Sequence, residues 1–158
     1  MQLHTITELL AIPDYRVSKM LVHTDRRLDL LLEQSTFSHA VCSRCGRVHN
    51  TPVHSIGMVV VEDLPISGKR VFLHVPKRKS LCARNGGIRV EKLDWLRGRF
   101  TKRYADQVYR LTSITTNQEA GWYLGLDDEV VYRIDRQYLE ELAKEKLSPV
   151  PAPRYMSV

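Results

Sequence analysis

The apolar residues of this chain first gather in short runs and later recur at helical spacing. Four stretches have strand character: Tyr15–Val22, Leu28–Gln34, Met58–Val61 and Arg70–Val75. The first two are predicted to form a hairpin. The last two are predicted to be strands joined through Leu64–Gly68, whose proline and glycine supply turn dihedrals.

Helical periodicity begins near Thr101. Spacings of four, four and three predict a helix over 101–112 with this apolar row: Phe100, Tyr104, Val108 and Leu111. Thr116 and Glu119 match a capping box, which starts a second helix that ends at Gly125. Asp127 or Asp128 then caps a third helix that runs through Val131, Ile134, Tyr138 and Leu142. A short lead-in helix is also predicted over 5–11.

This pattern predicts an α+β protein, in which a small β-rich, zinc-ribbon-like domain is followed by a three-helix domain. We assign residues 1–90 to the first domain, 91–100 to a linker, 101–147 to the helical domain and 148–158 to a proline-rich extended tail. A chain of 158 residues divided in this way gives each part little core of its own, so the first part needs help to fold.

The helical region has the spacing of a helix-turn-helix. Gly121 is small where two helices would pack closely, and Gly125 permits the turn. Leu126, Val131 and Ile134 would hold the third helix against the first. Plain helical hairpins share this spacing, and the acidic residues at the start of the third helix suit its dipole better than they suit phosphates.

Three cysteines supply the help that the β-rich part needs. Cys42 and Cys45 form a Cys-x-x-Cys pair, and Cys82 follows after a predicted hairpin, as in a zinc ribbon. Asn85 stands where a second pair would end, and its neutral amide is a poor zinc ligand. Zinc is the expected cofactor. The fourth ligand is left open between Asn85 and His49, with other candidates at His39, His54 and His74.

The alternative is a degenerate ribbon in which the cysteines are small buried hydrophobic residues. An odd cysteine number and the absence of a signal-peptide-like or long apolar stretch predict a reduced, soluble, intracellular protein without disulfides. We therefore expect neither a membrane nor a small-molecule substrate as partner.

Charge is segregated along the chain. The formal net charge is +6, yet residues 66–110 hold thirteen Lys or Arg against three acidic residues. Such a field indicates an anionic polymer as partner, although a solvated lysine-rich face is the plainer explanation. Trp95 and Phe100 interrupt the basic run, and we expect them to hold the linker against a neighbouring domain rather than to stack on bases.

These pieces together resemble the N-terminal part of bacterial insertion-sequence transposases of the ISL-three family. The resemblance rests on segments in a fixed order over nearly the whole chain: Ile12–Tyr15, Cys42–Gly46, Glu62–Pro65, Gly68–Val71, Arg99–Arg103, Leu124–Leu126 and Ile134–Glu140. In that family the region binds the DNA of the element ends, and a ribonuclease-H-like catalytic domain follows. The resemblance implies that 153–158 begins that domain, so we expect no nuclease or transposase activity from this chain.

The leading hypothesis is a module that binds double-stranded DNA in the bacterial cytoplasm, at the nucleoid when bound. Arg133, Tyr132 and Arg136 are expected to reach base edges. The remaining contacts are assigned to phosphates: Lys77, Arg78, Lys79, Arg97, Arg99, Lys102, Arg103, Thr116 and Gln118.

A second hypothesis is a transposase-derived adaptor that docks on a protein or a nucleoprotein complex, and a protein partner or a homodimer fits either hypothesis. An enzyme is the weakest interpretation, because the acidic residues and histidines follow no spacing that ties them to one site and neither cysteine of the pair has an assigned base.

Overall fold

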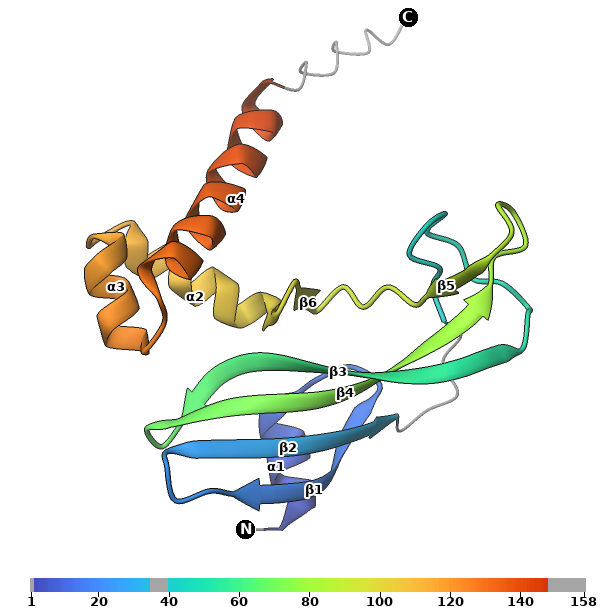
Figure 1. Ribbon diagram of the computed structural model, residues 1–158, viewed down its shortest axis with the longest axis horizontal. Helices are drawn as coiled ribbons and strands as arrows, with labels where there is room; N and C mark the ends of the chain where they lie inside the picture. Colours follow the sequence, from blue (N-terminus) through green and yellow to red (C-terminus); the bar gives the residue numbers. More distant parts are fainter. Residues whose placement is uncertain (1, 35–39, 148–158) are drawn as a thin grey trace, which may run out of the picture. The chain divides into compact units, whose positions relative to one another are not determined.

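The computed structural model describes residues 2–34 and 40–147, which divide into two compact units, Met1–Tyr104 and Ala105–Val158. The predicted tail 148–158 and the candidate ligand His39 lie outside the described residues. Strands and a zinc-ribbon-like tip build the first unit, and helices build the second (Figure 1). This is the α+β organisation that the sequence predicted.

The first unit is built on a twisted sheet with the strand order β1-β2-β4-β3-β7-β6. β1 (Tyr15–Val22) and β2 (Arg27–Gln34) form the predicted antiparallel hairpin. β2 then pairs in parallel with β4 (Lys69–Leu81), with Arg27 opposite Arg70. β3 (Val53–Ile66) runs antiparallel to β4.

The hairpin of β3 and β4 is longer than the sequence predicted. The predicted runs, 58–61 and 70–75, cover only the middle of each strand. Both strands extend beyond these runs because their ladder continues to Val53 and Ser80 at one end and to Ile66 and Lys69 at the other. The turn is tighter than the predicted 64–68: Ser67 and Gly68 both have positive φ, 49° and 73°, as a two-residue hairpin turn requires.

Apolar side chains from β1, β2 and β4 form the core beneath one face of the sheet. Leu30, Val71, Leu73 and Val75 are fully buried, and α1 (Leu3–Leu10) covers them with Ile6 and Leu10. Trp95 packs edge-on against Tyr15, with ring centroids 5.5 Å apart. The segment predicted as a linker is therefore fixed to the first unit, as the predicted role of Trp95 requires.

Three short strands complete this unit. β5 (Ile88–Val90) pairs with the far end of β4, while β6 (Leu96–Arg97) and β7 (Phe100–Thr101) pair with each other. β7 also touches β3 at one bridge, Glu62 to Phe100. The predicted linker, 91–100, thus supplies strands to the sheet.

The helices follow the local signals closely. α2 (Lys102–Thr112) begins within a residue of the predicted start and crosses from the first unit into the second. α3 (Asn117–Leu124) has the capping box at Thr116 and Glu119, and Gly125 ends it with φ of 67°. α4 (Asp128–Leu147) contains the predicted apolar positions of the third helix. Across residues 2–34 and 40–147, every helix is too short or too polar to span a membrane.

Candidate metal centre and basic surface

The first cysteine pair sits on a tight loop before β3. The amide of Gly46 donates to the carbonyl of Cys42 at 2.9 Å, and the amide of Cys42 donates to the carbonyl of Arg47 at 2.9 Å. Gly46 has φ of 69°, which a residue with a side chain rarely adopts. The amide of Arg44 approaches the Cys42 sulfur at 3.4 Å. These bonds form a knuckle that turns both thiols to one side.

The loop after β4 repeats this backbone pattern. Gly86 donates to the carbonyl of Cys82 at 2.8 Å, and Cys82 donates to the carbonyl of Gly87 at 3.0 Å. The offsets of four and five residues equal those of the first knuckle. Asn85 therefore occupies the position that Cys45 holds in the first loop, as the sequence predicted, and its side chain is exposed.

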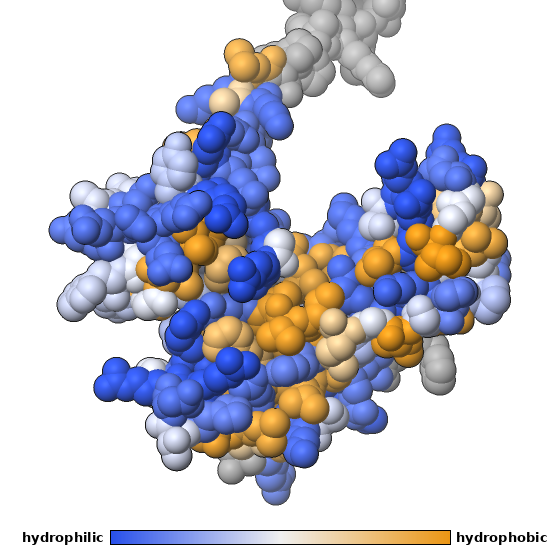
Figure 2. Space-filling model, viewed as in Figure 1, coloured by the Kyte–Doolittle hydropathy of each residue, from blue (hydrophilic) through white to orange (hydrophobic). Residues whose placement is uncertain are grey.

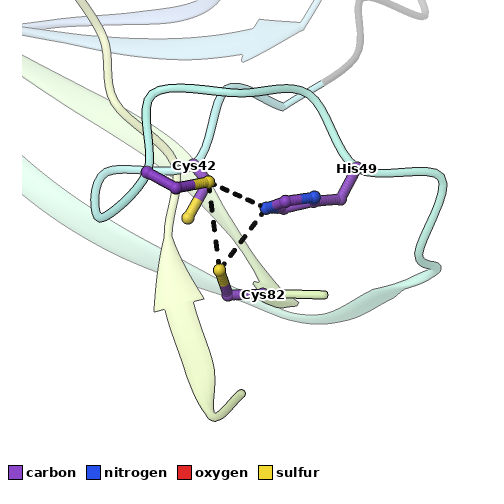
Figure 3. Close-up of side chains that lie close together, drawn as sticks. Cys42, His49 and Cys82 are labelled. Carbon is purple, nitrogen blue, oxygen red and sulfur yellow. Dashed lines mark hydrogen bonds between the residues drawn. The ribbon is translucent and has the colours of Figure 1, made fainter. Parts of the chain in front are cut away.

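His49 supplies the fourth donor atom. Its Nε2 lies 3.1 Å from the Cys45 sulfur and 3.4 Å from the Cys82 sulfur, and these two sulfurs are 3.9 Å apart. With Cys42 included, the four donor atoms all lie within 4.8 Å of one another. Figure 3 shows Cys42, His49 and Cys82 pointing toward a common centre, with Cys42 and His49 on one loop and Cys82 on the other.

This donor set fits zinc. Tetrahedral Zn²⁺ with bonds of about 2.3 Å to sulfur and about 2.0 Å to nitrogen places its donors roughly 3.3–3.8 Å apart. The separations between the donors here are close to that range, and three thiolates with one imidazole form a closed structural site. Such a site would supply folding free energy to the ribbon and leave no open position for catalysis.

The knuckle also prepares its thiol for a metal. The backbone N–H groups of Cys45 and Arg44 lower the pKa of the Cys42 thiol to about 6, because they donate to the sulfur and stabilise its charged form. A thiolate is the form that binds zinc. The other described histidine candidates lie elsewhere: His54 is exposed beside Ser55, and His74 contacts Asp29 in the sheet.

The predicted phosphate-binding residues of the first unit differ in how exposed they are. Lys77 and Lys79 lie half-buried on β4, while Arg99 and Lys102 are exposed beside β7 and at the start of α2. Arg97 is half-buried in β6. These five basic side chains are the candidates for phosphate contacts in the first unit.

Two further predicted residues are engaged inside the protein. Arg103 donates to both carboxylate oxygens of buried Asp63, and its Nη1 donates to the carbonyl of Leu10. Arg78 donates to buried Glu91 with its side chain and, at 2.7 Å, with its amide. Both guanidiniums therefore neutralise buried carboxylates, a role that the sequence did not reveal because the partners lie far away along the chain.

The sheet carries a charged cluster that sequence reasoning missed. Asp29 is only 3% exposed and accepts bonds from Arg27 at 2.7 and 2.8 Å. His74 and His23 approach its two oxygens at 2.7 and 2.9 Å. Arg27 also stacks over the Phe72 ring, 4.2 Å from its centroid. Since β2 and β4 pair in parallel, only the fold brings these residues together.

The second unit brings predicted residues together at the start of two helices. Gln118 of α3 and Tyr132 of α4 line one shallow hollow of about 400 Å³, together with Asn117, Asp128 and Glu129. Thr116 caps α3, with its hydroxyl accepting from the amide of Glu119 at 3.2 Å. The two arginines are exposed: Arg133 lies 3.8 Å from Glu129, and Arg136 donates to Glu140 at 2.9 Å.

Comparisons with known proteins agree with this centre. The family described as zinc-finger of transposase IS204/IS1001/IS1096/IS1165 matches residues 38–84. The transposase for insertion sequence element IS1001 from Bordetella parapertussis is 36% identical over 106 residues, which cover 65% of this chain and 25% of the relative. The chain thus spans about a quarter of the length of that relative. The comparison with solved structures gives no significant match.

The matched segment, 38–84, contains all four donor residues, the whole first knuckle and the start of the second. Residues 38–84 are therefore similar to the zinc ribbon of insertion-sequence transposases, and zinc is the metal that the cluster of three cysteines and one histidine fits.

Proposed function

We propose that this chain is a DNA-binding module of the transposase type, which reads duplex DNA at element ends through a helix-turn-helix and holds the backbone through its basic residues. His49 is part of the same proposal, as the fourth zinc ligand in place of Asn85. The similarity to an insertion-sequence transposase supports the class of partner. The observation that carries the proposal is the packing of α3 against α4.

The packing of α3 against α4 requires a residue without a side chain at Gly121. A Cβ atom at this position would lie 2.7 Å from the carbonyl oxygen of Leu126 in the turn and 3.5 Å from the Cα of Asp128, so glycine lets α4 begin this close to α3. Gly125 reverses the chain in the left-handed conformation, and its amide donates to the carbonyl of Gly121. A short, tight turn between two helices of this kind is the scaffold of a helix-turn-helix. α4 would be the helix that enters the major groove.

The exposed face of α4 presents Tyr132, Arg133 and Arg136. The arginines pair with glutamates one turn away, but such exposed pairs contribute little to stability because water screens them. A guanine edge or a phosphate can therefore replace the glutamate at little cost. Thr116 and Gln118 at the start of α3 are assigned to the DNA backbone, where the helix dipole favours phosphate.

Basic residues of the first unit would add affinity without sequence choice. Lys77, Lys79, Arg97, Arg99 and Lys102 are assigned to phosphates, where neutralised charge releases counterions. Arg78 and Arg103 are weaker members of this set because each is already bound to a buried carboxylate.

Selection of duplexes from a random DNA pool tests the proposal directly. The zinc-loaded chain should enrich a motif of several base pairs at physiological salt. Arg133→Ala should weaken binding to that motif by about 1–3 kcal/mol and relax base preference at one position. Lys144→Ala, at the far end of α4, serves as the matched control and should bind as the unaltered chain does. Equal losses on the motif and on random duplex would remove Arg133 from base reading.

One observation favours the adaptor as a second candidate. Asp128 and Glu129 line the hollow beside Tyr132, and these carboxylates would repel a phosphate at the start of α4. A basic or aromatic peptide would suit this hollow better than DNA. Retention of duplexes without an enriched motif, or no retention, would move the adaptor to first place.

A further inference from the structure

The outer edge of β3 is open over most of its length. β3 pairs with β4 along one edge, whereas within residues 2–34 and 40–147 the other edge makes one bridge, from Glu62 to Phe100. The stretch Ser55–Val61 contains no charged residue and no proline. An uncharged, regular edge of this kind is a template for another strand.

The opposite edge of the same sheet is protected in three ways. β1 exposes Arg16 and Lys19, and a bulge interrupts its register between Val17 and Lys19. The amide of Val17 donates to the Thr7 hydroxyl at 2.9 Å, so α1 covers part of the edge. Charges, bulges and covering elements are the devices that prevent strands from pairing with other chains. Ser55–Val61 has none of the first two.

The backbone at the open edge points outward at alternate residues. The amide of Glu62 donates away from β4, to the carbonyl of Arg99 at 2.9 Å. Since peptide groups alternate along an antiparallel strand, Ile56, Met58 and Val60 also direct their amides and carbonyls outward. Within the part of the chain that the structure describes, outward-facing donors and acceptors without a strand partner therefore stand at every second residue.

The same three residues expose their side chains on one face of the sheet. Val61 and Val59 stand opposite Leu73 and Val75 in the ladder, on the core face. Ile56, Met58 and Val60 therefore lie on the other face, and they are 64%, 59% and 47% exposed. Hydrophobic residues are visible along the course of this hairpin in Figure 2.

We propose that the open edge of β3 pairs with β3 of a second copy of this chain, in an antiparallel ladder centred on Met58. In this register Met58 stands opposite Met58 of the partner subunit, and Ile56 stands opposite Val60 of the partner subunit. All three are the outward-pointing positions, so each facing pair exchanges two backbone hydrogen bonds. The two-fold axis passes between the two Met58 residues.

A second copy is the occupant that this edge fits best. The apolar row meets an identical apolar row on the same face, and no like charges are brought together within Ser55–Val61. On the core face Gly57 stands opposite Val59 of the partner subunit, which pairs the smallest residue with a branched one. A groove of about 660 Å³ separates Val59, Val60 and Val61 from residues 90–99 of the same chain.

Sedimentation of the zinc-loaded full chain across a concentration series, without DNA, tests the pairing. The mass should rise from 18.3 kDa toward twice that value as concentration increases. Met58→Lys places two charges together at the axis and should hold the mass at one chain. Val22→Lys is the matched control, because Val22 is also 59% exposed but lies on the protected edge, and it should dimerise like the unaltered chain.

Amide hydrogen exchange read by NMR gives a second measurement on the unaltered chain. Exchange at Ile56, Met58 and Val60 should slow as concentration rises, while the amide of His23, which is bonded to Arg27 within the chain, should not change. A mass of one chain at every concentration, a Met58→Lys variant that still dimerises, or concentration-independent exchange at these amides would each overturn the proposal. Because no DNA is present, these outcomes are separate from those of the DNA selection.

Discussion

His49 shows how a single residue can complete a site whose expected ligand is missing. The second knuckle keeps its backbone hydrogen bonds although Asn85 replaces the thiol, and the imidazole of His49 reaches the two sulfurs of Cys45 and Cys82 from the other side. The knuckle geometry is thus set by the backbone and its glycines, whereas the donor set depends on what surrounds the centre.

His49→Ala is expected to lower zinc affinity by more than about 100-fold, since even groups that only contact a ligand contribute about 10–100-fold. Competition with a chromophoric chelator measures the loss. His54→Ala is the control, because His54 is exposed and contacts Ser55 rather than the sulfurs, and it should bind zinc unchanged. In the His49→Ala background, Asn85→Cys should restore affinity. Unchanged affinity of His49→Ala would remove this histidine from the site.

Gly121 of α3 lies close to the backbone of the turn that leads into α4. Alanine is the better helix former by about 1 kcal/mol, but its Cβ would lie 2.7 Å from a backbone oxygen that cannot rotate away. The steric cost wins, so Gly121→Ala should destabilise the helices by about 1–3 kcal/mol. Thermal unfolding followed by circular dichroism measures it, with exposed Trp122→Ala as a neutral control. A stabilised Gly121→Ala would mean that propensity decides.

At the scale of the elements, an ion pair on β2 stabilises the sheet of the first unit. Hydrogen bonds from Arg27, with His74 beside it, hold the pKa of Asp29 well below its usual range. The unfolded chain binds a proton at this carboxyl near its ordinary pKa of about 3.9, whereas the folded chain does not. Its stabilising contribution is therefore complete above about pH 5 and is lost progressively as the pH falls.

Asp29→Asn should accordingly cost about 2 kcal/mol of unfolding free energy at pH 7, because two guanidinium bonds lose their charged acceptor. The difference between the two proteins should shrink toward pH 3. Urea unfolding at a series of pH values gives both curves. A difference that stays constant with pH would show that packing, not charge, makes the carboxyl important at this position.

Elements with local signals could be predicted from the sequence, and elements that depend on distant partners could not. The capping box of Thr116 and Glu119 and the turn at Gly125 are complete within a few residues, so α3 was placed closely. The parallel pairing of β2 with β4 joins segments about forty residues apart, and nothing local specifies it. The choice of His49 over other histidines depends on the same long-range folding, although a Cys-x-Arg-x-Gly spacing occurs at both 42–46 and 82–86.

At the scale of the whole molecule, the excess of positive charge lies in the sheet unit and at the start of α2. If this charge holds DNA phosphates, log Kd must vary steeply with log salt, with a slope of about 0.9 for each phosphate neutralised. Lys77→Gln with Lys79→Gln should reduce that slope by about 2 on every duplex sequence. Lys19→Gln, on the protected edge of the sheet, should leave it unchanged. An unaltered slope in the double variant would place the DNA elsewhere.

Three of the four zinc donors, Cys42, Cys45 and His49, lie within eight consecutive residues, and the fourth arrives only after the long hairpin. A chain that is still being synthesised would therefore present a three-donor chelate before β3 and β4 leave the ribosome. Closing the loop to Cys82 then costs only the modest entropy of a flexible chain of this length. Zinc capture would come first, and the ion would act as the anchor around which the hairpin later folds.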